Sequence, residues 1–201
     1  MQVVDPSAVD RRSWEAAVRH LYEDAFSFVA TGPRTQEDWW ADVLAVMERA
    51  VPDPRGWTGL DDTESERTPA APAFPFRPPF KADPQRRLTP ADVGQRLREI
   101  DRASAENLLL ALTDGGCTLR NLKRFTESFE ELRDMARTLL ARYGDVFTCH
   151  TNVSVGARTD GTLDFGASHW GYTPMAFYGE DAGLVVVSDT EVGLFWTFDD
   201  I

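Results

Sequence analysis

At Gly144 the spacing of the apolar residues changes from that of helices to that of strands. Before this glycine, apolar residues recur every three or four positions. After it they alternate with other residues, as they do along 192–198. The turns between the expected strands are short, which is typical of an antiparallel meander. The sequence therefore predicts an α+β fold, with about four N-terminal helices packed on one face of a C-terminal antiparallel sheet of four to five strands.

The helices are expected over 7–30, over 36–50, from Thr89 to the glycine pair at 115–116, and over 118–143. Thr35 and Thr89 are the expected N-caps of the second and third helices, and Pro90 suits the first position of the third. The short connection at 115–117 predicts that the last two helices are antiparallel neighbours.

Between the helical pairs lies a proline-rich segment, 52–88, which holds eight of the twelve prolines. It also carries Phe74, Phe76 and Phe80, which are unusual in a plain linker. One interpretation is a docking peptide for an aromatic groove on another protein. The favoured one is a strap whose phenylalanines pack on this chain. We expect one domain over 1–201, made of a helical pair (1–51), the strap (52–88), a helical hairpin (89–144) and the sheet (145–201).

Strands are expected over 146–157, 162–172, 174–178, 184–188 and 192–198, and the first two form a hairpin around the Asp-Gly pair at 160–161. Of two possible registers, the one that pairs Val153 with Ala167 places the apolar residues in one row. In this register Cys149 is inside, and His150 and His169 are on opposite faces, so we expect no metal site.

The same register predicts an outer face that combines aromatic rings with small polar groups and a carboxylate. Such a face is typical of a surface that binds a protein partner, because tryptophan and tyrosine are frequent in interface hot spots. The alternative is that a helix or the strap covers it. The candidate partner-binding residues are His150, Asn152, Asp164, Ser168, Trp170 and Tyr172.

The acidic charge of the chain has two interpretations, a basic partner or simple solubility, and the charge alone favours the second. The net charge is −12, and residues 145–201 contain nine acidic residues and one basic residue, Arg158. This surface repels nucleic acid and would speed the encounter with a basic protein. The simpler alternative is that acidic loops keep the protein soluble.

No known catalytic motif and no cofactor-binding motif is present, so we expect no catalytic residues and no cofactor. No apolar run approaches the ~20 residues of a membrane span, no secretory leader is visible, and the two cysteines, Cys117 and Cys149, are typical of a cytoplasmic protein. The leading hypothesis is a non-enzymatic protein that binds or neutralises a basic protein, for example a bacterial immunity protein or antitoxin opposing a nuclease-like toxin. The alternative is a small enzyme or small-molecule binder with a pocket between helices and sheet that contains His169 or Tyr172.

Overall fold

The structure is a computed structural model that describes residues 9–23, 25, 27–68, 74–76, 86–113, 119–154, 171–176 and 178–199. The α-helices in this part of the chain are α1 (Arg11–Tyr22), α2 (Trp39–Met47), α3 (Pro90–Arg96), α4 (Arg102–Ala111) and α5 (Phe129–Ala141), with short 3-10 helices η1 (Glu64–Glu66) and η2 (Leu119–Arg124). The strands are β1 (Ser27–Pro33), β2 (Leu60–Asp61), β3 (Arg98–Ile100), β4 (Phe147–Thr151), β5 (Glu180–Ser188) and β6 (Glu191–Asp199).

These strands form a single antiparallel sheet in the order β2-β1-β6-β5-β4-β3, which confirms the α+β class. Three of the strands expected after Gly144 are present, as β4, β5 and β6, but β4 pairs with β5 and β3 and not with the expected strand 162–172. The sheet is larger than expected because β1, β2 and β3 come from segments before Gly144. The turn between β5 and β6 is held by the Ser188 hydroxyl oxygen, which accepts the backbone N–H of Glu191 at 3.0 Å.

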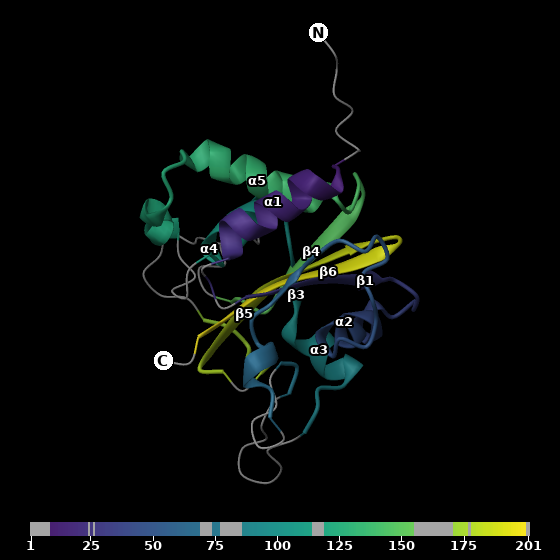
Figure 1. Ribbon diagram of the computed structural model, residues 1–201. Helices are drawn as coiled ribbons and strands as arrows, with labels where there is room; N and C mark the ends of the chain where they lie inside the picture. Colours follow the sequence, from purple (N-terminus) through teal and green to yellow (C-terminus); the bar gives the residue numbers. More distant parts are fainter. Residues whose placement is uncertain are drawn as a thin grey trace.

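Helices lie on both faces of the sheet, so the prediction of a single covered face is wrong (Figure 1). Leu184 and Val186 of β5 join a core with α1, α4 and α5, whereas Val185 and Val187 join a second core with α2 and α3. β5 is apolar on both sides because it lies between two layers of helices. Such a continuous apolar run is the pattern of a strand buried on both faces.

All four expected helices are shorter than predicted, because strands or loops replace their ends. The first ends at Tyr22, and β1 follows, with Phe28 and Val29 in opposite cores. The third is divided by β3 into α3 and α4. The fourth begins at Ser128, where a capping box with Glu131 starts α5.

The cap signals explain where these helices begin. Thr89 caps α3 as predicted, in a capping box with Asp92. A second cap, the Asp101 carboxylate, accepts the N–H of Ser104 at 2.6 Å and starts α4. In α2 the N-cap is Asp38 and not Thr35, whose hydroxyl donates to the buried Asp42 at 2.8 Å.

Phe74 of the proline-rich segment packs on the chain's own core, as the strap interpretation predicted. Its side chain is 1% exposed, and its ring centroid lies 5.5 Å from Phe28 and 5.3 Å from Trp196. Phe76 is half-buried under the guanidinium of Arg87, 4.7 Å from the ring centroid. Phe80 is outside the described residues.

No helix in the described ranges is both long and apolar enough to cross a membrane.

Candidate functional site

The structure describes three of the six residues predicted to bind a partner, namely His150, Asn152 and Tyr172. Asp164, Ser168 and Trp170 lie outside the described residues, as do His169 and the Asp-Gly pair at 160–161. The three described residues do not share one exposed face.

Asn152 is buried, so its predicted place on an exposed outer face is wrong. Its amide nitrogen donates to the backbone oxygens of Asp181, at 2.8 Å, and Thr173, at 3.0 Å. Its amide oxygen accepts the N–H of Gly183 at 3.0 Å. These bonds join β5 to the segment before it, so Asn152 has a structural role.

Tyr172 is half-buried, and its hydroxyl donates to the backbone oxygen of Gly179. It forms an antiparallel bridge with Val153, and Ser154 N–H donates to Gly171 O at 2.6 Å. The predicted register paired Val153 with Ala167 and is therefore wrong at this point. The described residues 174–176 and 178 form no strand, in contrast to the prediction.

His150 lies on the opposite face of β4 from Cys149, as predicted. The Cys149 thiol is buried in the core with α4, and burial raises its pKa to about 12, so it is not a reactive thiol. The His150 ring lies 4.5 Å from the ring of Trp39, and its Nε2 is 3.0 Å from the Thr148 hydroxyl. Burial lowers the pKa of His150, and the nearby carboxylate of Glu99 partly opposes this shift.

Six residues around this ring contact form what we call the acidic aromatic patch. Trp39, Trp40 and His150 are half-buried, and Glu37, Asp38 and Glu99 are exposed. Trp39 meets Trp40 edge to face, with centroids 6.0 Å apart, and Glu99 lies directly opposite His150 in the β3–β4 register. The ring of Trp40 covers Gly94 of α3, where a Cβ would overlap it. The patch therefore has rigid rings and carboxylates from three separate parts of the chain.

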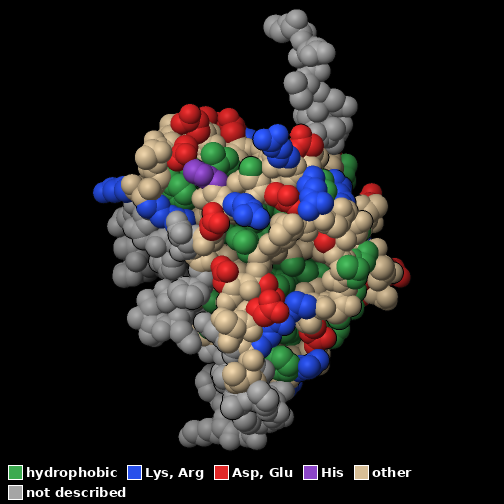
Figure 2. Space-filling model, viewed as in Figure 1, with side chains coloured by type: hydrophobic (Ala, Val, Ile, Leu, Met, Phe, Trp, Pro, Cys, Tyr) green, Lys and Arg blue, Asp and Glu red, His purple; other side chains and the backbone are tan. Residues whose placement is uncertain are grey.

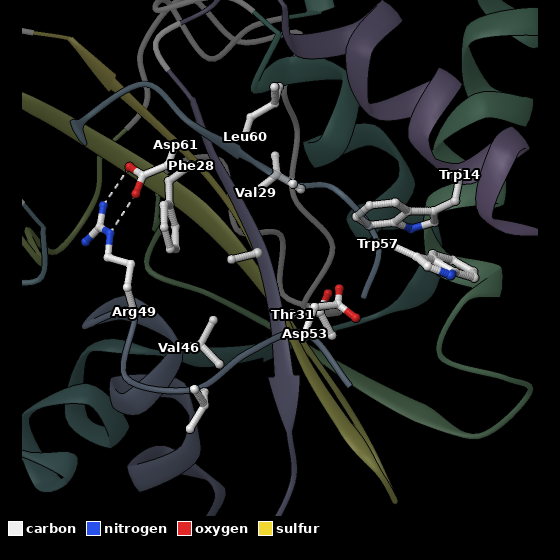
Figure 3. Close-up of a pocket in the computed structure, with 13 residues that line it drawn as sticks. Trp14, Phe28, Val29, Thr31, Val46, Arg49, Asp53, Trp57, Leu60 and Asp61 are labelled. Carbon is white, nitrogen blue, oxygen red and sulfur yellow. Dashed lines mark hydrogen bonds and ion pairs between the residues drawn. The ribbon is translucent and has the colours of Figure 1, made fainter. Parts of the chain in front are cut away.

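A second feature is a cavity of about 230 Å³ at the edge of the sheet beside β1 (Figure 3). Trp14 and Trp57 lie at one side of β1, and Arg49 and Asp61 lie at the other. The cavity is lined neither by Tyr172 nor by any other described member of the predicted site.

The charged groups around the cavity are paired. Asp61 binds Arg49 through two bonds, at 2.8 and 2.9 Å. Asp53 binds the buried Arg142 through two bonds of 2.7 Å, and Glu191 lies 3.1 Å from the same guanidinium. The Arg142 guanidinium also lies over the rings of Trp14 and Trp57, at 5.0 and 4.6 Å from their centroids. Sequence reasoning missed this cluster because its members are far apart along the chain.

A hollow of about 320 Å³ lies between the end of α1 and η2, lined by Arg19, His20 and Glu127 among others. The His20 ring nitrogen is 3.1 Å from a carboxylate oxygen of Glu127. Acidic and basic side chains are mixed over the face formed by α1 and α5 (Figure 2). Ion pairs such as Arg11–Glu15 and Arg137–Asp134, both at 2.8 Å, account for this mixture. This face offers no continuous field of one sign.

Within the described ranges, no group of three or more His, Cys, Asp or Glu side chains could hold a metal ion. We take the acidic aromatic patch and the cavity beside β1 as the candidate binding features of the described residues. A comparison with models of known protein families finds no match, and neither a curated protein nor a solved structure matches the chain.

Proposed function

We propose that this chain is a non-enzymatic binding protein that holds a basic protein through the acidic aromatic patch. The observation that carries the proposal is the contact of Trp39 with His150, bordered by exposed carboxylates. A bacterial immunity protein or antitoxin that blocks a basic, nuclease-like toxin inside the cell is a function of this kind.

The charge of the patch supports a basic partner. Glu37 and Glu99 are exposed and form no ion pair with any described residue, whereas most carboxylates on α5 are paired with arginines. The neighbouring cations are directed elsewhere: Arg98 donates to Val153 O at 2.7 Å, and Arg96 donates to Asp92 O at 2.9 Å. Unpaired carboxylates are available to cations of a partner, and they accelerate its association.

The aromatic rings supply contact area that is already ordered. Trp40 is fixed on Gly94, and Trp39 is fixed between Trp40 and His150, so little side-chain entropy is lost when a partner covers them. Tryptophans that are held in place and bordered by polar groups are typical interface hot spots. Asp164, Ser168 and Trp170 remain predicted contributors to the same function.

The test compares the parent with the double variant Trp39→Ala/Glu99→Gln. A matched control is Phe129→Ala/Glu130→Gln, which removes one exposed ring and one exposed carboxylate on α5. A protein captured from the native host by the parent is purified, and its Kd for each variant is measured by calorimetry at two salt concentrations. We expect a basic partner whose Kd rises at least about tenfold for the patch variant and stays unchanged for the control. A captured partner that is acidic, or that binds the patch variant as tightly as the parent, would contradict the proposal.

A further inference from the structure

The outer edge of β1 is only partly covered by β2. Asp62 N–H donates to Ser27 O at 3.0 Å, so the backbone groups of Ser27 face β2. Arg34 N–H donates to Thr190 O at 2.8 Å, so the even-numbered residues face β6. Because backbone groups alternate along a strand, those of Val29 and Thr31 also face the outer edge. Val29 pairs with Leu60, and Thr31 comes next.

The residue in line to pair with Thr31 is held elsewhere. Continuing the register of β1 and β2 would place Thr58 opposite Thr31. Thr58 instead donates its N–H to the Glu15 carboxylate of α1 at 2.7 Å, and Arg11 fixes this carboxylate at 2.8 Å. Within the described ranges, the Thr31 N–H and C=O consequently have no hydrogen-bond partner on the outer side of β1.

The cavity of about 230 Å³ lies at this unpaired part of the edge. Ala30 and Thr31 form part of its wall, and the rings of Trp14, Trp57 and Phe28 form other parts. The cavity is smaller than the ~300–1,000 Å³ typical of pockets for drug-sized molecules. Its charged side chains, described above, are engaged with each other. The site thus offers one backbone donor, one backbone acceptor and aromatic walls, without an unpaired charge.

We propose that this cavity binds a short, uncharged, extended peptide segment, which adds to the edge of β1 at Thr31. The segment accepts the Thr31 N–H and donates one of its own amides to the Thr31 oxygen, as in strand addition at a sheet edge. One of its apolar side chains fills the space beside Trp57. This site is separate from the acidic aromatic patch and does not depend on it.

The test uses the capped tripeptide acetyl-Val-Leu-Val-N-methylamide as probe. Its comparison compound carries an N-methyl group on the central amide, which removes the donor but keeps the apolar surface. Binding is followed by tryptophan fluorescence and by the ¹⁵N–¹H signal of Thr31. We expect the Thr31 signal to shift on binding and the N-methylated compound to bind at least tenfold more weakly. An unchanged Thr31 signal, or equal binding of both compounds, would overturn the proposal in favour of a purely apolar cavity.

Two variants locate the site. Ala30→Leu fills the cavity and should weaken tripeptide binding at least tenfold, whereas Ala16→Leu on the exposed side of α1 should bind like the parent. Val51 is another lining residue, and Val51→Ile replaces Ala30→Leu if that variant does not fold. Tripeptide binding by both filled variants at the parent's affinity would contradict the proposed location. The patch variant Trp39→Ala/Glu99→Gln should bind the tripeptide normally, so this proposal and the proposed function can fail separately.

Discussion

The indole ring of Trp196 lies directly on the backbone of Gly183 in the neighbouring strand. The two residues are paired in the register of β5 and β6, and a Cβ at Gly183 would overlap the six-membered ring of the indole. The other face of the indole is stacked on Phe74, and its Nε1–H points to Asp181 at 3.4 Å. The glycine therefore provides the space that lets the largest side chain of this core lie flat on the sheet.

The first prediction is that Gly183→Ala destabilises the protein although alanine is the smallest possible replacement. The added methyl group must displace Trp196, which is packed between two layers, so we expect a loss of about 1–3 kcal/mol in the free energy of unfolding. Chemical denaturation measures this loss. The double variant Gly183→Ala/Trp196→Leu should show a smaller added cost for the methyl group than the parent background does. A Gly183→Ala protein as stable as the parent would show that the indole is not held on this glycine.

The second prediction concerns Arg142, which is buried between two tryptophans and bound to two carboxylates. Burial opposes its charge, but the hydrogen bonds to Asp53 and Glu191 prevail and raise its pKa above the ordinary value. Arg142→Met keeps much of the volume but leaves Asp53 without its buried partner. Because removing one member of a buried ion pair is costly, we expect a loss of about 3–5 kcal/mol, measured by urea denaturation.

The control for Arg142 is Arg137→Met on α5. Arg137 is also bound by several carboxylates, including Asp134 at 2.8 Å, but its side chain is 40% exposed. Solvent screens such pairs, so the control should lose much less stability than Arg142→Met. Equal losses for the two variants would contradict the structural role assigned to the buried cluster.

The α+β class and the start of α3 were predictable from the sequence because they depend on local signals. Thr89 with Asp92 is a capping box within four residues, and the β5–β6 hairpin follows from alternating residues around a short turn. The positions of β1 and β3 were not predictable in this way. Val29 occurs in a short apolar segment, and Ile100 is a single apolar residue among charged ones. Both patterns fit a helix or a strand, and only pairing with distant strands decides between them.

The candidate sites were less predictable than the fold for the same reason. His150 was identified, but its contact with Trp39 joins residues more than 100 positions apart. The hydrogen bonds of Asn152 and Asp181 to the backbone also depend on such distant contacts. The sequence does not distinguish a buried polar side chain of this kind from an exposed one. The cavity at Thr31 depends on the short length of β2. Glu15 of α1 limits this length because its carboxylate accepts the N–H of Thr58.

The third prediction is that Asp181→Asn destabilises the protein at pH 7. Burial raises the pKa of Asp181 to about 7, while the N–H groups of Met175 and Ala176, at 2.9 and 3.0 Å, oppose this shift. Asn152 donates to the same carboxylate at 3.2 Å. An asparagine would direct its own NH₂ group at some of these donors, so we expect a loss of about 1–3 kcal/mol, measured by thermal unfolding. A neutral effect would mean that the side chain is protonated and already donates a hydrogen bond.

The fourth prediction is that His150 weakens the fold as the pH falls. Burial lowers its pKa in the folded protein below the ordinary value of about 6.5, so the unfolded chain binds the proton more readily. The free energy of unfolding should therefore decline as the pH drops through 6.5 and level off below the folded pKa. Asp181 acts in the opposite sense between about pH 4 and pH 7, because its folded pKa is raised.

The effect of His150 is therefore measured by comparing variants. His150→Phe keeps a ring against Trp39 and should lose the decline, whereas Glu99→Gln should retain it. Denaturant titrations at pH 7.5, 6.5 and 5.5 measure these slopes, and identical slopes for His150→Phe and the parent would rule out the titration of a half-buried imidazole at this position.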